Sequence, residues 1–418
     1  MLTSKPRGTN DIIPGETELW QKIEAIITSL ARNYGYREIR TPIFEHTELF
    51  LRGVGENTDI VDKEMYTFED KGGRSLTLRP EGTAAVARAY LENKMYAWPQ
   101  PVKMYYLGPM FRHDRPQAGR YRQFHQFGVE IFGTSHPASD AEVIHLCMAF
   151  YQLIGLENLE LHINSVGCPQ CREILRQKLM AYFESHRNDL CSICRQRVER
   201  NPLRILDCKN KICRDAGKDA PTPLDCLCQE CRDHFASVRR YLDVQQIAYI
   251  VNPRLVRGLD YYTKTAFEVI APDIGAQSAI GGGGRYDGLV ETCGGPHIPG
   301  VGFAIGLERT ISVIRKQGLE QETHRLMAFV AMAGDTEDVA TRIIYTLRQA
   351  GVSCDRDYIG RSLKAQMKYA SKINAKYVVI VGEDELARGN VTLRDMDTGK
   401  QYEVELDKLV AEIKSNTC

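Results

Sequence analysis

The sequence has no excess of charge of either sign and no long hydrophobic run. Lys and Arg together number 54, as do Asp and Glu, in a chain of 418 residues. Overall charge therefore gives no argument for nucleic-acid binding, and any RNA contact has to come from local basic patches. The first residues, MLTSKPRGTNDIIPGE, hold no apolar run of signal-peptide length, and no stretch approaches transmembrane length. We therefore expect a cytoplasmic protein with no membrane partner.

The length and composition predict an ordinary globular protein of more than one domain. A chain of 418 residues is longer than one hydrophobic core supports, and 43% hydrophobic with 26% charged residues is a common balance. Residues 317–324 are polar and uneven, which is typical of a linker. We expect a first domain over 1–322, interrupted by a Cys-rich, mostly helical insertion at about 168–243. A second domain, over 326–418, has the βαβα pattern of an α/β fold.

Cysteine is concentrated in the insertion, where nine of the 13 cysteines fall between Cys168 and Cys231. Paired CxxC spacings without a secretory signal favour thiolate metal ligands over disulfides, because a reducing cytosol keeps thiols free. Zn²⁺ suits a tetrahedral thiolate set. We therefore hypothesise a structural Zn²⁺, with buried free thiols or a redox pair as alternatives. The candidate ligands are Cys168, Cys171, Cys191 and Cys194.

A long hairpin carries a group of arginines. The spacing predicts strands over Val102–Arg112 and Gln123–Phe132, joined by a polar loop. Arginines bind phosphate oxygens in bidentate fashion, so the loop favours polyphosphate or RNA, although a solvated charged loop is the alternative. The arginines are Arg112, Arg115, Arg120 and Arg122, against the single acid Asp114.

Two polar residues share one face of the return strand. Gln126 and Glu130 are four positions apart, and side chains alternate along a strand, so both point the same way. The rest of this segment is rich in aromatic residues. A polar pair on a strand otherwise rich in aromatic residues therefore favours a binding site over a solvated sheet edge.

The stretch Leu255–Val269 places a cation, an acceptor and two phenols just before a predicted strand. Arg257, Asp260, Tyr261 and Tyr262 lead into the alternating segment Tyr262–Val269. Ligand sites tend to form at such edges, but a salt-bridged turn before a core strand is the commoner arrangement. Taken alone, this stretch favours a structural interpretation, and we assign Asp260 no role.

Three further segments contain candidate site residues. Glu81 and Thr83 lie where a short strand turns into a helix, and Thr83 is suited to cap that helix, Ala84–Tyr90. Four consecutive glycines before Tyr286 allow a backbone to approach a ligand closely, although their spacing is not that of a dinucleotide loop. Arg309 falls in the first turn of a helix after Gly306, which suits an anion between the cation and the helix dipole.

The two ends of the chain carry weaker patterns. The predicted helix Glu16–Asn33 and strand Tyr36–Phe44, which contains Pro42, indicate a dimer surface. In the last domain a basic stripe recurs at helical spacing. It is either a solvated face or a phosphate-tracking face, and consists of Arg361, Lys364, Lys368, Lys372 and Lys376.

Taken together, these segments resemble the class II aminoacyl-tRNA synthetases, and specifically the histidyl-tRNA synthetase family, over nearly the whole chain. The hairpin from Phe111 to Glu130 is similar to motif 2, Gly302–Arg309 to motif 3, and the helix and strand through Pro42 to motif 1. The segments Leu255–Tyr262 and Gly281–Gly288 resemble the two histidyl-specific signatures. The cysteines depart from the family pattern, so we expect no catalytic role for them.

The resemblance implies an α+β fold: an antiparallel-sheet catalytic domain with an inserted Cys-rich domain, and a C-terminal α/β anticodon-binding domain. It also implies formation of histidyl adenylate and pyrophosphate from histidine and ATP with Mg²⁺, then transfer of histidine to the 3′ end of tRNA(His) by a homodimer. The insertion would lie over the tRNA acceptor arm. No protein ligand for a catalytic metal is expected.

The resemblance further implies a role for each site residue. Arg112, Arg120 and Arg309 would hold phosphates, and Arg257 would bridge the histidine carboxylate and the α-phosphate. Glu81, Thr83 and Gln126 would take the α-amino group. Glu130 and Tyr262 would bond the imidazole nitrogens, while Tyr261 and Tyr286 close the pocket. These groups would reject analogues that leave them unpaired, so no editing module is expected.

Two other functions are compatible with parts of this pattern. A regulatory paralogue binds histidine without charging tRNA, but such a protein typically lacks the anticodon-binding domain. A ligase for another amino acid would not explain Glu130 together with Tyr262. Histidine-dependent pyrophosphate exchange followed by tRNA charging separates all three.

Overall fold

The computed structural model describes residues 3–55, 58, 60–115, 119–206, 208, 210–272, 278–320 and 325–415. The chain divides into two compact units, Met1–Glu320 and Gln321–Cys418. Residues 116–118 of the arginine-rich loop and residues 321–324 of the expected linker lie outside the described residues.

An eight-stranded sheet forms the centre of the first unit. Its strand order is β1-β5-β6-β11-β10-β9-β7-β8, and all neighbours are antiparallel except β1 with β5 and β7 with β8. This confirms the predicted hairpin and the antiparallel sheet. The strands are β1 (Arg37–Glu38), β5 (Val102–Phe111), β6 (Gln123–Phe132), β7 (Glu160–Ser165), β8 (Ile250–Val251), β9 (Thr263–Ile270), β10 (Ala279–Arg285) and β11 (Gly300–Gly306).

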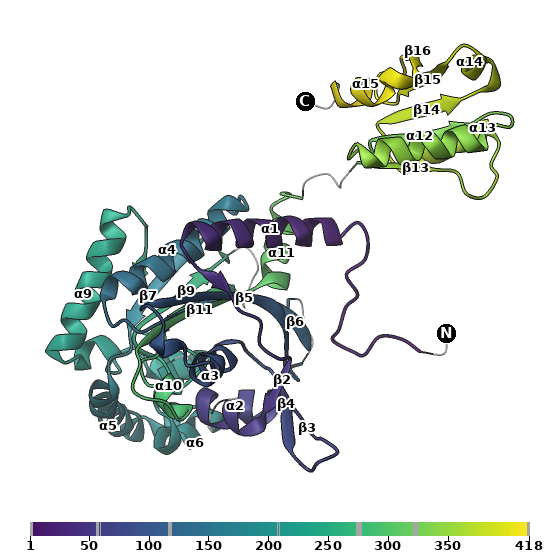
Figure 1. The fold of residues 1–418 in the computed structure, drawn as a ribbon. Helices are drawn as coiled ribbons and strands as arrows, with labels where there is room; N and C mark the ends of the chain where they lie inside the picture. Colours follow the sequence, from purple (N-terminus) through teal and green to yellow (C-terminus); the bar gives the residue numbers. More distant parts are fainter. Residues whose placement is uncertain are drawn as a thin grey trace. The chain divides into compact units, whose positions relative to one another are not determined.

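Long helices cover one face of this sheet with an apolar layer (Figure 1). Ile23 and Ile27 of α1 join one buried cluster with Phe127 and Val129 of β6, because the helix repeats its apolar residues every three to four positions. The same layer includes α4 and α11, and α9 packs along α4. These helices are α1 (Thr17–Asn33), α4 (Pro137–Leu153), α9 (Gln229–Val244) and α11 (Leu307–Lys316).

The opposite face carries shorter helices and leaves room for a pocket. Tyr90 of α3 and Leu289 of α10 pack with Tyr106 and Tyr286 against the sheet. The shorter elements are α2 (Thr47–Val54), the π-helical turn η1 (Ile60–Glu64), α3 (Thr83–Glu92), the 3-10 turn η2 (Met95–Ala97) and α10 (Leu289–Thr292).

The predicted single strand Tyr36–Phe44 is wrong. The chain instead forms β1 in the large sheet and then β2 (Phe44–His46) in a separate three-stranded sheet, ordered β2-β4-β3. Pro42 lies between the two strands and lacks the amide hydrogen that a continuous ladder needs. The remaining strands of the small sheet are β3 (Tyr66–Glu69) and β4 (Ser75–Leu78).

The Cys-rich stretch between β7 and β8 is helical throughout its described regular elements. Besides α9 it contains α5 (Pro169–Ser185), η3 (Arg187–Asp189), α6 (Ser192–Arg200), α7 (Leu203–Leu206), α8 (Lys211–Ala216) and η4 (Pro223–Cys226). All of these elements except α5 and α9 are under ten residues long, and the buried cluster of the stretch includes Cys194, Cys213 and Cys226. Cysteines therefore occupy positions where larger apolar side chains stand in an ordinary core.

The second unit is a five-stranded sheet of order β13-β12-β14-β15-β16 with helices on both faces. Val330 and Val379 pack under α12 and α15, while Phe329 and Val378 pack under α13, because successive strand residues face opposite sides. The elements are β12 (Ala328–Met332), α12 (Glu337–Gln349), β13 (Cys354–Arg356), α13 (Leu363–Lys372), β14 (Tyr377–Val381), α14 (Glu383–Ala387), β15 (Asn390–Asp395), β16 (Gln401–Glu405), η6 (Leu406–Lys408) and α15 (Leu409–Ser415). In neither unit does a described helix have the length and apolar character that crossing a membrane requires.

Candidate active site

A pocket of about 340 Å³ opens on the sheet face opposite α1 and α4. Its size and its mixture of aromatic and charged groups are typical of a small-molecule site. Segments far apart in the sequence line it together. The predicted site residues on its wall are Glu81, Thr83, Arg112, Arg120, Gln126, Arg257, Tyr261, Tyr262, Tyr286 and Arg309.

Glu81 caps the helix that follows it, in place of Thr83. The Glu81 carboxylate accepts hydrogen bonds from the backbone N–H groups of Thr83 and Ala84, both at 2.8 Å. The expectation that Thr83 caps the helix is therefore wrong, since Thr83 is the first helical residue and Gly82 precedes it. Burial raises the pKa of Glu81, and the two N–H bonds oppose that rise. The cap fixes Glu81 at the pocket wall.

Three arginines form the phosphate-binding candidate. Arg112 donates to the Pro80 carbonyl at 2.8 Å, and Arg309 donates to the Gly119 and Ala279 carbonyls at 3.1 and 2.8 Å. Arg120 pairs with Asp114 at 2.6 Å. Burial lowers the pKa of Arg309, and the nearby cations Arg120 and Arg112 lower it further. Such mutual repulsion is relieved by an anion bound among the three.

Arg257 lies against the glycine-rich strand β10. Its Nη1 pairs with Glu268 Oε1 at 2.5 Å, and its guanidinium carbon lies 5.9 Å from the centre of the Tyr262 ring. A Cβ on Gly282 would stand 2.8 and 2.9 Å from the two terminal nitrogens of Arg257. The guanidinium can therefore approach β10 only because position 282 has no side chain.

Glu130 lies behind the pocket wall, fully buried, where Tyr286 donates its hydroxyl hydrogen to Oε2. A side chain on Gly302 would clash with this carboxylate. Burial raises the pKa of Glu130 to about 8. Glu130 therefore meets the pocket through Tyr286, which lines it. Its other carboxylate oxygen, Oε1, is buried and has no hydrogen-bond partner within the described part of the chain.

Gln126 has spare hydrogen-bonding capacity. Its side chain is 8% exposed and lines the pocket, and within the described part of the chain its Oε1 has no hydrogen-bond partner. A buried amide oxygen without a partner is costly, so a ligand donor at this point would be favourable.

Several residues on the wall were missed by sequence reasoning. Glu268 shares the alternation of β9 with other strand residues, and only its pairing with Arg257 distinguishes it. Glu64 and Arg204 reach the pocket from a π-helical turn and from the insertion, and neither lies in a recognisable motif. Glu308 accepts from the backbone N–H and Nδ1 of His125, each at 2.9 Å, and so joins β6 to α11.

The cysteines form two separate groups of four. Sulfur atoms within each group all lie within 4.8 Å of one another. The candidate ligands predicted from the sequence are thus divided, because Cys168 and Cys171 belong with Cys228 and Cys231, whereas Cys191 and Cys194 belong with Cys208 and Cys213. The four predicted residues therefore do not form one site, because each pair meets two cysteines from further along the chain. Either group could hold a metal ion.

Comparison with known proteins identifies the fold and its activity. A family model described as histidyl-tRNA synthetase matches residues 8–310, and one described as anticodon binding domain matches 326–416. The histidine-tRNA ligase of Desulforamulus reducens is 61% identical over 419 residues, covering 100% of both chains. That of Desulforudis audaxviator is 62% identical over 415 residues, covering 99% of each. The apo histidyl-tRNA synthetase of S. aureus superposes with a TM-score of 0.85 at 42% identity, covering 99% of this chain and 100% of that one.

The antiparallel sheet, the arginine-lined pocket and these matches define a class II aminoacyl-tRNA synthetase. Within that class, the chain belongs to the histidyl-tRNA synthetase family. Its activity is the ATP-dependent ligation of histidine to tRNA, with AMP and pyrophosphate as products.

Proposed function

We propose that the pocket described above carries out both steps of this reaction, with tRNA(His) as the acceptor. In the first step a histidine carboxylate oxygen attacks the α-phosphorus of ATP, and the bond to pyrophosphate breaks. In the second, the terminal ribose 3′-hydroxyl attacks the histidyl carbonyl carbon, AMP leaves, and the hydroxyl proton is lost. The observation that carries the proposal is that one pocket contains three clustered arginines beside a carboxylate and tyrosine group.

The arginines stabilise charge that develops during adenylation. Arg112 binds the α-phosphate, and Arg309 and Arg120 bind the outer phosphates. This role is supported by the closeness of the three cations, since Arg120 and Arg112 lower the pKa of Arg309. ATP enters with Mg²⁺, held by its phosphates. Arg257 bridges the histidine carboxylate and the α-phosphate, where its charge acts most strongly on the pentacovalent transition state. Glu268 orients that guanidinium at 2.5 Å.

The polar wall binds the amino acid. Glu81, Thr83 and Gln126 take the α-amino group, a role supported by the unpartnered Gln126 oxygen in the described structure. Glu130 and Tyr262 bond the two imidazole nitrogens, and Tyr261 forms the wall beside Tyr286, with their ring centres 5.6 Å apart. Tyr286 donates to Glu130 Oε2, so the imidazole N–H donates to Oε1, which has no partner in the described structure.

Two assays test this function in order. Histidine-dependent exchange of labelled pyrophosphate into ATP measures the first step, and charging of tRNA(His) measures the second. We expect both, and other amino acids serve as the control. Histidine binding without exchange would instead identify a histidine-binding regulatory paralogue, and exchange with a different amino acid alone would reject the pocket assignment.

We also propose a homodimer, which acts in the cytoplasm where ATP and tRNA meet. Exposed apolar residues gather around the small sheet, with Ile43, Phe44 and Phe68 exposed by 45%, 51% and 44%. They lie on or beside β2 and β3, which flank β4. A second copy covering them would remove apolar surface from water. Sedimentation at the monomer mass would contradict this assembly.

The domain roles follow from the same reaction. The unit over 1–322, with its insertion at 168–243, activates histidine and receives the acceptor arm. The unit over 326–418 holds the anticodon, supported by the family match over 326–416. The metal of the cysteine groups is structural Zn²⁺, because four thiolates suit its tetrahedral preference.

A further inference from the structure

Arginines of the Cys-rich insertion hold the loop that carries the histidine-site residues. Arg172 Nη1, on α5, donates to the backbone carbonyls of Asp260 and Tyr262 at 3.0 and 2.7 Å. Arg204, on α7, donates to the Gly258 carbonyl at 2.9 Å. Three alternate carbonyls of the loop 258–262 are thus bonded to the insertion. Tyr261 and Tyr262 stand on this loop and Arg257 directly precedes it, and all three line the pocket.

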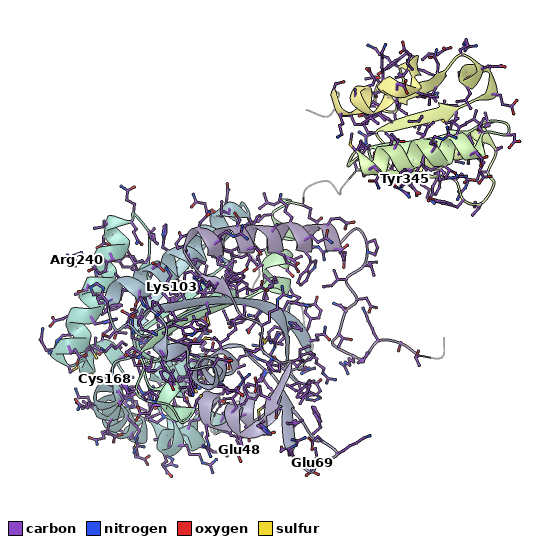
Figure 2. All side chains as sticks on the ribbon, viewed as in Figure 1. Glu48, Glu69, Lys103, Cys168, Arg240 and Tyr345 are labelled. Atoms are coloured by element: carbon purple, nitrogen blue, oxygen red, sulfur yellow. The ribbon has the colours of Figure 1, made fainter. Side chains whose placement is uncertain are left out.

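Arg172 is fixed in turn by the first cysteine group. It follows Cys171 directly, and its backbone N–H donates to the Cys168 carbonyl at 3.0 Å. Cys168 and Cys228 are the N-cap residues of α5 and α9, so the group joins the first turns of two helices; Figure 2 labels Cys168 in this region. The position of the Arg172 side chain therefore depends on how the four sulfurs are held.

The spacing of the four sulfurs fits a tetrahedral metal site. Four thiolates at Zn–S distances of about 2.3 Å stand about 3.8 Å apart. The Cys168 and Cys171 sulfurs are 3.5 Å apart, too far for a disulfide. Cys171 Sγ also accepts from the Cys228 backbone N–H at 3.1 Å, and Cys213 Sγ accepts from that of Cys191 at 3.1 Å. Such N–H bonds to sulfur stabilise bound thiolates.

The apolar cluster around these four sulfurs is small. The local buried cluster consists of Cys171, Cys231 and Leu227, with Leu224, Cys168 and Cys228 partly buried around it. Leu227 and Leu224 supply the apolar side chains other than cysteine in this cluster. The bodies of the two helices pack elsewhere, α5 through Leu175 and Leu179 and α9 through Phe235 and Val238, so a metal at the sulfurs would fix their first turns and Arg172.

We propose that the metal in the group Cys168, Cys171, Cys228 and Cys231 is a positioning element for histidine activation. Zn²⁺ binds the four thiolates as their protons leave, which fixes α5 against α9. Arg172 then holds the Asp260 and Tyr262 carbonyls, and with them Arg257 and Tyr262. This inference rests on the proposed function and on the proposed zinc. The proposal also gives Asp260 a role, since its backbone carbonyl accepts the hydrogen bond from Arg172.

The first test separates Arg172 from the metal. Arg172→Gln keeps all four cysteines, so zinc content is expected to stay at two per chain. Histidine KM in pyrophosphate exchange is expected to rise and the rate per active site to fall, each about tenfold, because a 1 Å misplacement costs about a hundredfold. Arg172→Lys, which can still donate to one carbonyl, is expected to recover part of the loss.

Arg176→Gln is the matched control. Arg176 lies one turn further along α5, and its ion pair with Glu173 stays within that helix. It is expected to leave both kinetic constants unchanged. Active-site titration normalises every rate, because a general loss of folded protein lowers the number of sites and leaves KM intact. Unchanged KM and rate per site in Arg172→Gln, with zinc retained, would overturn the positioning role.

The second test removes one metal. Cys228→Ser is expected to lower zinc from two to one per chain and to reproduce the Arg172→Gln kinetics in the remaining sites. Cys226→Ala changes a buried cysteine that belongs to neither group and is expected to keep two. Wild-type protein purified without chelator that carries no zinc would overturn the metal assignment. Absence of exchange in the wild type would instead reject the proposed function.

Discussion

The basic groups of the two units differ in how they are held. In the candidate active-site pocket Arg257 is paired with Glu268. Arg112 donates to the Pro80 carbonyl, and its guanidinium carbon lies 5.3 Å from the centre of the Phe124 ring. On α13 of the C-terminal unit, Lys364, Lys368 and Lys372 are exposed and make no hydrogen bond or ion pair within the described structure. One set has fixed geometry, and the other is a solvated stripe.

This difference separates two uses of positive charge. A guanidinium fixed in a pocket acts on charge that appears at one place in the transition state, and the low local dielectric strengthens it. A solvated ammonium attracts a polyanion over a surface and is screened by salt. The first use should affect rate constants, and the second should affect binding and its salt dependence.

The largest difference between a fixed and a solvated cation is expected at Arg257. Arg257→His is expected to lower the rate of adenylation about 10²–10³-fold, as for loss of one preorganised donor to a developing charge, with a much smaller rise in histidine KM. Pre-steady-state pyrophosphate release measures this. Arg240→His, an exposed arginine on α9 labelled in Figure 2, is the control. A defect confined to KM would contradict the transition-state role.

A buried carboxylate sharpens the same contrast. Glu130→Gln is expected to reduce kcat/KM for histidine about a hundredfold. A buried polar site selects its substrate by hydrogen bonds, and the variant changes the group that bonds the imidazole. Glu268→Gln is the comparison variant, a second carboxylate change in the pocket. It should act through Arg257 and therefore lower the rate more than it raises histidine KM. An unchanged histidine KM in Glu130→Gln would contradict direct recognition of the imidazole.

The same variant has a stability consequence whose sign follows from its pKa. Glu130 has a pKa of about 8 in the folded protein, above its ordinary 4.5, so the folded state favours the protonated form. Its contribution to stability is present below the ordinary pKa and is lost as pH rises toward 8. Glu130→Gln avoids that loss. Its melting temperature relative to wild type should therefore increase between pH 5 and pH 8, as thermal denaturation can measure.

The sequence predicted the elements with strong periodicity and the residues carried by motifs. The hairpin and α1 appear close to their expected bounds, since local alternation or helical spacing decides them. Ten of the candidate residues line one pocket. They could be predicted together because the family resemblance implies a whole site, which no single segment does. The class of fold, the activity and the family are confirmed.

What the sequence missed depends on contacts between distant segments. Cys168 lies far along the chain from Cys228, and spacing alone could not tell which CxxC units meet. Glu81 replaced Thr83 as the cap because a longer side chain reaches two N–H groups at once. The role of Asp260 depends on hydrogen bonds that the sequence does not reveal, from Arg172 to its carbonyl and from Arg204 to the Gly258 carbonyl.

The smallest expected effect concerns the solvated stripe. Changing Lys364, Lys368 and Lys372 together to alanine should raise KM for tRNA several-fold and leave histidine-dependent exchange unchanged. Loss of three phosphate contacts should also lower the slope of log KM against log salt by about 2–3, at roughly 0.7–0.9 per contact. Steady-state charging across a salt series measures both quantities.

A matched variant removes the same charge elsewhere in the unit. Lys400, Lys408 and Lys414 are exposed outside α13, so their joint change to alanine alters net charge equally without touching the stripe. If only net charge mattered, both triple variants would shift tRNA KM alike. A flatter salt slope confined to the α13 variant is expected, because counterions are released only where lysines contact phosphates. Equal slopes in the two variants would make the stripe an ordinary solvated face.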